Sequence, residues 1–107
     1  MNTLDTLYNV IQTRRSQPQE GSYTCYLLDK GLDKILKKVG EESAEVIIAA
    51  KNPSCQQLVQ EVADLLYHLQ VMLSVRDIPW KDVDIELMRR AEKIGNLKPM
   101  READKNT

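Results

Sequence analysis

Hydrophobic residues recur along this chain at intervals of three and four positions, which places them on one face of an α-helix. The first segment with this spacing spans about residues 2–14, and a polar loop containing Pro18 and Gly21 follows it. Its hydrophobic positions are Leu4, Leu7, Tyr8 and Ile11. The pattern predicts that the chain begins with an amphipathic helix.

A short helical turn and a long second helix are predicted next. Thr24 can cap the turn, which ends near Gly31 because glycine disfavours continued helix. The second helix runs from there to about Lys51. It ends at Asn52-Pro53, since a residue that precedes proline avoids helical backbone angles.

Two further helices complete the predicted bundle. Ser54 can cap a third helix that ends near Val75, before a turn rich in turn-forming residues. The fourth helix begins at Trp80, ends at about Ile94 and is stopped by Gly95. The sequence thus predicts an all-α fold, a bundle of four main helices.

The composition agrees with one helical domain. The 107 residues are the size of a single domain, 42% of them are hydrophobic, and there is no Phe and only one Trp. We expect one all-α domain over residues 1–95 and a frayed tail over residues 96–107. A bundle this small gains core by sharing it, so we also expect dimerisation.

Charge and cysteine content exclude several classes of protein. Fifteen Lys and Arg against sixteen Asp and Glu give a net charge of -1, which argues against general binding to nucleic acid or to anionic membranes. The longest apolar run, residues 46–50, is far shorter than the ~20 residues of a membrane span. No signal-peptide layout is visible, so we expect a cytoplasmic protein. Cys25 and Cys55 lack a C-x-x-C spacing and are expected to be reduced thiols.

The inner face of the second helix carries a carboxylate among hydrophobic residues. Steps of three and four give the positions Ile35, Val39, Glu42, Val46 and Ala49. Glu45 lies three residues after Glu42, and Glu41 lies one turn before Glu45. Three acids therefore share one surface of this helix.

The third helix repeats this arrangement. Its inner stripe consists of Leu58, Glu61, Leu65, His68 and Met72, and Asp64 follows Glu61 at a spacing of three. Ionised carboxylates are rarely buried unless they are paired or bind a metal. Oxygen ligands from two facing helices suit Mg²⁺ or Mn²⁺, so the two acidic pairs predict a site for one of these ions.

Other interpretations remain open for individual residues. Each acid could instead form a salt bridge with a nearby lysine or arginine, and His68 could be a metal ligand or a core residue. A carboxylate-bridged iron bundle is a rival, but it pairs Glu with His at i, i+3, whereas both partners here are acidic. Lys34 and Lys38 are either a solvated face or a basic edge for an anion beside the metal. A metal next to lysines would stabilise charge on phosphoryl oxygens.

Three segments of the chain resemble the phosphoribosyl-ATP pyrophosphatase family of histidine biosynthesis. They are Ser22-Tyr23-Thr24, residues 38–46 (KVGEESAEV) and residues 61–68 (EVADLLYH). The resemblance covers about residues 4–90. That family belongs to the all-α nucleoside triphosphate pyrophosphatases, whose signature is Glu-Glu-x-x-Glu followed by Glu-x-x-Asp. The signature is complete here as Glu41, Glu42, Glu45, Glu61 and Asp64.

This resemblance implies an activity. The expected reaction is hydrolysis of the α–β phosphoanhydride of phosphoribosyl-ATP to phosphoribosyl-AMP and pyrophosphate with Mg²⁺, the second step of histidine biosynthesis. The resemblance also implies a homodimer. The alternatives are a housekeeping pyrophosphatase acting on other nucleoside triphosphates and a non-enzymatic helical dimerisation module.

The resemblance also implies roles for individual residues. Glu41 is either a further ligand or the group that holds or deprotonates the attacking water. Lys34 and Lys38 would contact phosphate oxygens. The metal ligands would be Glu42, Glu45, Glu61 and Asp64. The nucleotide would be contacted by Ser22, Tyr23 and Thr24, although Thr24 can equally be only a helix cap and Tyr23 only a core residue.

Overall fold

The computed structural model describes residues 2–93, 98 and 100–105. Within these residues the chain forms helices and turns without any strand, which confirms the all-α prediction. The helices are α1 (Thr3–Ser16), α2 (Tyr23–Lys30), α3 (Leu32–Ala50), α4 (Cys55–Val75), α5 (Trp80–Ala91) and α6 (Glu102–Lys105). None of them combines the length and the apolarity needed to cross a bilayer.

The structure corrects the predicted start of α2. Ser22, rather than Thr24, is the N-cap: its backbone is extended and its side chain accepts a hydrogen bond from the amide of Cys25. Thr24 lies inside the helix, and its hydroxyl bonds to that of Tyr67 on α4. Both residues can cap a helix chemically, and the backbone of Ser22 is the one that leaves the helical conformation.

The other predicted boundaries agree closely with the structure. The side chain of Ser54 accepts a hydrogen bond from the amide of Gln57 and caps α4, as expected. Helix α5 ends at Ala91, whereas residues 94–97, where its end was predicted, lie outside the described residues. The four-residue helix α6 falls within the predicted tail. The boundary between domain and tail stays a prediction.

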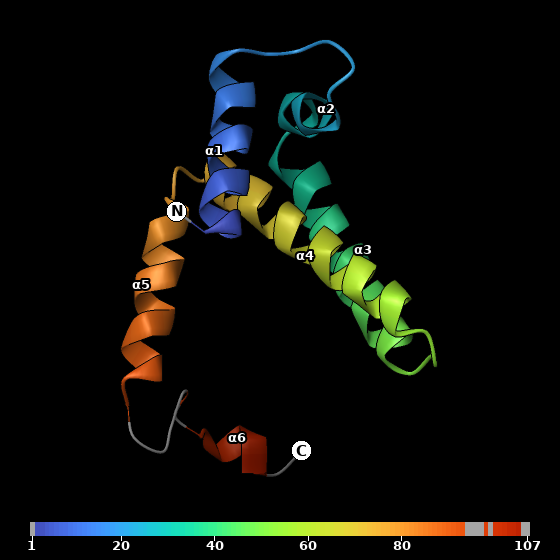
Figure 1. Ribbon diagram of the computed structural model, residues 1–107, viewed down its shortest axis with the longest axis vertical. Coiled ribbons are helices and arrows are strands. Elements are labelled where there is room, and N and C mark those ends of the chain that lie inside the picture. The colour runs from blue at the N-terminus through green and yellow to red at the C-terminus, as the bar shows by residue number, and fades with distance from the viewer. Residues whose placement is uncertain (1, 94–97, 99, 106–107) are drawn as a thin grey trace.

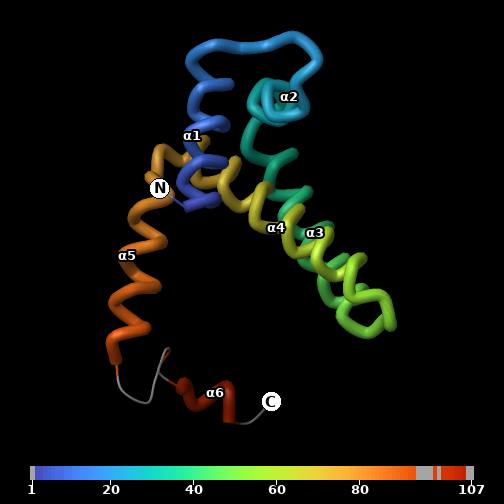
Figure 2. The backbone as a smooth tube through the Cα atoms, in the orientation of Figure 1, coloured from blue at the N-terminus to red at the C-terminus, as the bar shows by residue number. Residues whose placement is uncertain are grey.

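Helices α3 and α4 form a long antiparallel hairpin that organises the molecule (Figure 1). Helices α1 and α2 pack against the half of the hairpin that contains the start of α3 and the end of α4, as the tube view also shows (Figure 2). Helix α5 leaves the end of α4 and contacts α1. The opposite half of the hairpin extends beyond the other helices.

The hydrophobic core lies where the first four helices meet. Each helix contributes one hydrophobic residue to this cluster, and the four, each at most 1% exposed, are Ile11, Leu27, Ile35 and Val71. The inner face predicted for α3 is confirmed at its two ends, where Ile35 and Ala49 are buried. Burying a large aliphatic side chain contributes about 1.5–3 kcal/mol, so these contacts fix α1 and α2 on the hairpin.

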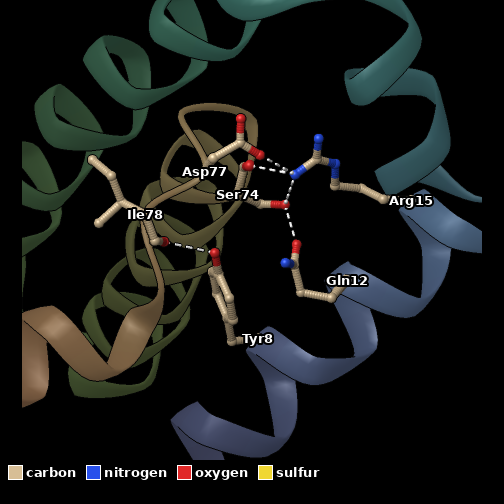
Figure 3. Close-up of polar contacts among 6 residues, drawn as sticks. All are labelled: Tyr8, Gln12, Arg15, Ser74, Asp77 and Ile78. Carbon is tan, nitrogen blue, oxygen red and sulfur yellow. Dashed lines mark hydrogen bonds and ion pairs between the residues drawn. The ribbon is translucent and has the colours of Figure 1, made fainter.

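Polar contacts fasten α1 to the end of α4 (Figure 3). The hydroxyl of Tyr8 donates to the carbonyl of Ile78 at 2.6 Å. The guanidinium of Arg15 donates to the carbonyl of Ser74 and lies 3.2 Å from a carboxylate oxygen of Asp77. These contacts hold the turn between α4 and α5, in which Asp77 has a positive φ of 58°.

Candidate active site

The hairpin brings acids of both long helices together. One carboxylate oxygen from each of Glu42, Glu61 and Asp64 lies within 4.8 Å of the others. Glu42 comes from α3, and the other two lie one turn apart on α4, so all three face the helix contact. The side chain of Glu42 is only 12% exposed, whereas Asp64 is exposed. The arrangement leaves the cluster open to solvent on the side of Asp64.

Repulsion between the acids of this cluster affects the pKa of Glu61. Partial burial raises the pKa of its carboxyl group, and a hydrogen bond with Glu42 and the negative charges of Glu42, Glu45 and Asp64 raise it further. Glu45 therefore acts on the cluster through its charge. Of the four acids predicted as metal ligands, Glu42, Glu61 and Asp64 converge and Glu45 lies outside this group.

Lys38 links the cluster to the remaining acid of the signature. Its ammonium nitrogen lies 3.4 Å from Glu41 and 3.7 Å from Glu42. Partial burial works to lower the pKa of Lys38, but the charge and hydrogen bond of Glu41, together with Tyr23 and Glu42, outweigh it, and the pKa is raised. Lys38 thus stays charged at the edge of the cluster. Lys34 is half-buried one turn earlier and has no ion pair among the described residues.

His68 is a hydrogen-bonded core residue and stands outside the acidic group. It is 4% exposed, and its Nδ1 donates to the carbonyl of Asp64 at 2.7 Å. Because Nδ1 carries the proton, Nε2 accepts, and the hydroxyl of Tyr23 donates to it at 3.0 Å. The open question about His68 is thereby answered in favour of the core. His68 therefore connects the hydroxyl of Tyr23 to the backbone of α4 at Asp64.

Tyr67 is a residue near the site that the sequence analysis did not single out. Its hydroxyl bonds to Thr24, and its ring packs against both Tyr23 and His68. Tyr67 lies three residues after Asp64, on the same side of α4. This spacing from Asp64 is the feature of the sequence that could have indicated a role for Tyr67 near the site. The two contacts from Tyr23 and Thr24 attach the start of α2 to α4.

A pocket of about 820 Å³ opens beside Tyr23. It lies between the end of α1, the loop over residues 17–22 and α2. Ser22 and Tyr23 line it, whereas Thr24 does not, because Thr24 is turned toward α4. Of the three loop residues predicted to contact a nucleotide, two therefore border a cavity of the size that ligands occupy.

Comparison with known families decides the affiliation of the chain. A family model described as Phosphoribosyl-ATP pyrophosphohydrolase matches residues 4–91. The chain belongs to this family. The match includes the acidic cluster, Lys38 and the Ser22–Thr24 segment.

Individual members of the phosphoribosyl-ATP pyrophosphohydrolase family are similar over almost the whole chain. A phosphoribosyl-ATP pyrophosphatase of Clostridium botulinum is 54% identical over 91% of this chain and 88% of its own length. One from Listeria monocytogenes is 54% identical over 92% of this chain and 95% of its own. One from Clostridium acetobutylicum is 50% identical over 96% of this chain and 94% of its own length.

The donor set of this family member fits a hard divalent cation. Glu42, Glu61 and Asp64 offer only carboxylate oxygens, and neither His nor Cys belongs to the group. Such ligands favour Mg²⁺, Mn²⁺ or Ca²⁺ over Zn²⁺ or iron held by nitrogen and sulfur. The site is thus a group of acids whose oxygen ligands suit a divalent cation, with Lys38 at its edge.

Proposed function

We propose that this protein hydrolyses the α–β phosphoanhydride of phosphoribosyl-ATP, giving phosphoribosyl-AMP and pyrophosphate in the second step of histidine biosynthesis. The observation that carries the proposal is the convergence of Glu42, Glu61 and Asp64 in a chain that belongs to the phosphoribosyl-ATP pyrophosphohydrolase family. The identity of about half the residues with named pyrophosphatases supports the substrate. A cytoplasmic location is part of this proposal.

The cation in the proposal is Mg²⁺, with Mn²⁺ as a substitute. When bound, it would neutralise charge on the phosphate oxygens of the substrate and on the leaving pyrophosphate. Its ligands in the proposal are Glu42, Glu45, Glu61 and Asp64. The pKa of Glu61 supports this set, because a carboxyl group that is hard to ionise beside other acids gains most from a cation.

The remaining polar residues orient the reactants. The attacking oxygen comes from water, a new P–O bond forms as the anhydride P–O bond breaks, and the water proton passes to a base. Glu41 is exposed beside the cluster and is the proposed group that holds or deprotonates this water. Lys38 and Lys34 would meet phosphate oxygens, with Lys38 already held at the edge of the acids.

The decisive experiment compares substrates. We expect the purified protein with Mg²⁺ to release pyrophosphate from phosphoribosyl-ATP with a kcat/KM at least tenfold above that for dUTP or dCTP. Tenfold corresponds to about 1.4 kcal/mol of differential transition-state binding. A preference for dUTP or dCTP would instead identify a housekeeping nucleotide pyrophosphatase.

Thermal melting with and without Mg²⁺ tests whether the protein binds the metal, since an ion that binds the folded state raises its stability. Unchanged melting and no turnover of any nucleotide would favour a non-enzymatic dimerisation module.

The proposal includes a homodimer built on the extended half of the hairpin. Ile47 and Ile48 on α3 and Val59 on α4 are each more than half exposed in the isolated chain. Gly40 lies on the same side of α3, and a Cβ placed there would meet nothing within 4 Å. Mid-helix glycine costs roughly 0.5–1 kcal/mol relative to Ala, so its presence without an internal contact supports close approach by a second chain.

A further inference from the structure

The pocket beside Tyr23 contains a cation, Arg14, whose side chain has no partner among the described residues. Arg14 lines the pocket and is half-buried, and its guanidinium has neither a hydrogen bond nor an ion pair within the described part of the chain. The adjacent Arg15 also lines the pocket but is held by the carbonyl of Ser74 and by Asp77. A partly buried guanidinium with five donors and no acceptor favours an anionic ligand.

Other groups of the pocket suit a nucleoside rather than a simple anion. The rings of Tyr23 and Tyr26 are nearly parallel, with centroids 6.0 Å apart, and both border the cavity. Glu20 and Asp29 also line it, and both are exposed without an ion pair in the described part of the chain. Carboxylates accept hydrogen bonds from ribose hydroxyls, and aromatic rings contact bases. About 820 Å³ is within the range that small-molecule sites occupy.

Tyr23 connects this pocket to the acidic cluster. Its ring borders the pocket, while its hydroxyl donates to His68, which in turn donates to the carbonyl of Asp64. Its phenol is also close enough to Lys38 and Glu42 for their charges to act on it. A ligand whose phosphates reach the acids can therefore extend past Tyr23 into the pocket.

The proposed substrate has the corresponding shape. Phosphoribosyl-ATP carries a triphosphate on one ribose and a monophosphate on a second ribose, with the adenine ring between them. ATP lacks the second ribose and its phosphate. A site that separates the two compounds needs a cation apart from the acids, and Arg14 lines the pocket, which none of the signature acids lines.

We infer that the pocket binds the monophosphate-bearing ribose of the substrate and that Arg14 binds its phosphate, which makes Arg14 a specificity-determining residue. This inference rests on the proposed function. Hydrogen bonds to charged groups contribute about 1.5–3 kcal/mol, which is roughly a 10- to 150-fold effect on affinity. The contact would act only on ligands that carry the second phosphate.

The test compares two nucleoside monophosphates, AMP and phosphoribosyl-AMP, which differ only in the phosphoribosyl group. Calorimetry with Mg²⁺ gives the Kd of AMP and of phosphoribosyl-AMP for the parent, Arg14→Ala and Arg14→Lys. We expect the parent to bind phosphoribosyl-AMP at least about tenfold more tightly than AMP, and Arg14→Ala to reduce this preference to within about threefold. Arg14→Lys should retain part of it, because it keeps the charge and loses the planar fork.

Arg76 provides the matched control. It is exposed, does not line the pocket, and its side chain has no ion pair in the described part of the chain. Arg76→Ala should keep the parent's preference. A parent without preference, or Arg14→Ala with the full preference, overturns the inference. If the parent hydrolyses phosphoribosyl-ATP in either case, the proposed function stands while the inference fails; absence of that turnover counts against the proposed function itself.

Discussion

Glu61 is surrounded by other acids on a partly buried helix face. Its hydrogen bond with Glu42 and the nearby charges of Glu45 and Asp64 all disfavour its ionised form. In a chain without a bound cation this repulsion opposes folding. A residue kept for stability alone would have a cationic partner, as Glu86 has in Arg89 and Arg90. Such a position does not favour stability, and it fits the proposed role of Glu61 as a ligand of a cation.

Changing Glu61→Gln should leave the metal-free melting temperature unchanged or raise it at neutral pH, while turnover of phosphoribosyl-ATP falls by at least about a hundredfold. The raised pKa means that the folded protein binds this proton more tightly than the unfolded chain does. Stability from Glu61 is then present at low pH and lost as pH rises through the raised pKa. Denaturant unfolding at several pH values measures this difference, which Glu61→Gln should remove.

Glu86→Gln is the control, because its expected effect on stability at neutral pH is opposite to that of Glu61→Gln. Hydrogen bonds from Arg89 and Arg90 lower the pKa of Glu86 to about 2. Its stabilising effect is present above the usual range for glutamate and is lost as pH falls toward 2. The substitution should lower stability slightly at neutral pH and leave turnover unchanged. A Glu61→Gln variant that melts well below the parent and still turns over at the parent's rate would contradict the metal-site assignment.

At the scale of elements, the short helix α2 depends strongly on its two ends. It has eight residues, shorter than the ~12–15 that an isolated helix needs to be marginally stable. Ser22 caps its start, and Gly31, with φ of 95°, ends it in a conformation that other residues rarely adopt. Leu27 is its buried anchor. The position of Tyr23 relative to the acids depends on these three residues.

Ser22→Ala should destabilise the protein by about 1 kcal/mol, the usual value of an N-cap hydrogen bond, and should also lower kcat/KM for phosphoribosyl-ATP. Ser54→Ala removes the equivalent cap of α4, which lies on the half of the hairpin away from the pocket. Denaturant unfolding and steady-state kinetics should give similar stability losses and a kinetic loss in Ser22→Ala alone. Equal kinetic losses would show that α2 has no special role at the site.

At the scale of the whole molecule, the core covers only part of the hairpin. The core cluster of Ile11, Leu27, Ile35 and Val71 lies where α1 and α2 meet α3 and α4. Beyond them, hydrophobic side chains of the hairpin stay exposed, among them Ile47 at 68% and Val59 at 66%. Exposed apolar surface of this kind is typical of a protein interface.

Light scattering should report at least a dimer, and Ile47→Glu should convert it to monomer with loss of activity. In a monomer the same change at an exposed position should alter stability by no more than about 0.5 kcal/mol. Met100→Glu is the control, since Met100 is 69% exposed and lies outside the hairpin. A parent that is monomeric at assay concentration and fully active would refute the dimer.

The periodicity of the sequence determined the helices, their inner faces and most of their ends. Those features depend on neighbours within a few residues: the cap at Ser54, the stop at Gly31 and the acids placed among hydrophobic positions of α3 and α4. The resemblance of short segments to a known family added the activity. Contacts between residues close in the sequence are the same in an isolated helix and in the folded chain. The predicted helices and caps were therefore confirmed.

Only the tertiary structure decided which side chains meet. The antiparallel packing of α3 and α4 selects Glu42 as the acid that joins Glu61 and Asp64, and it sets Lys38 between Glu41 and Glu42. Periodicity predicts on which face of its helix a residue lies, but not which residue of the neighbouring helix lies opposite it. The same limit applies to the pairs Tyr23–His68 and Thr24–Tyr67 and to the pocket containing Arg14, because each joins segments that are far apart in the sequence and adjacent only after packing.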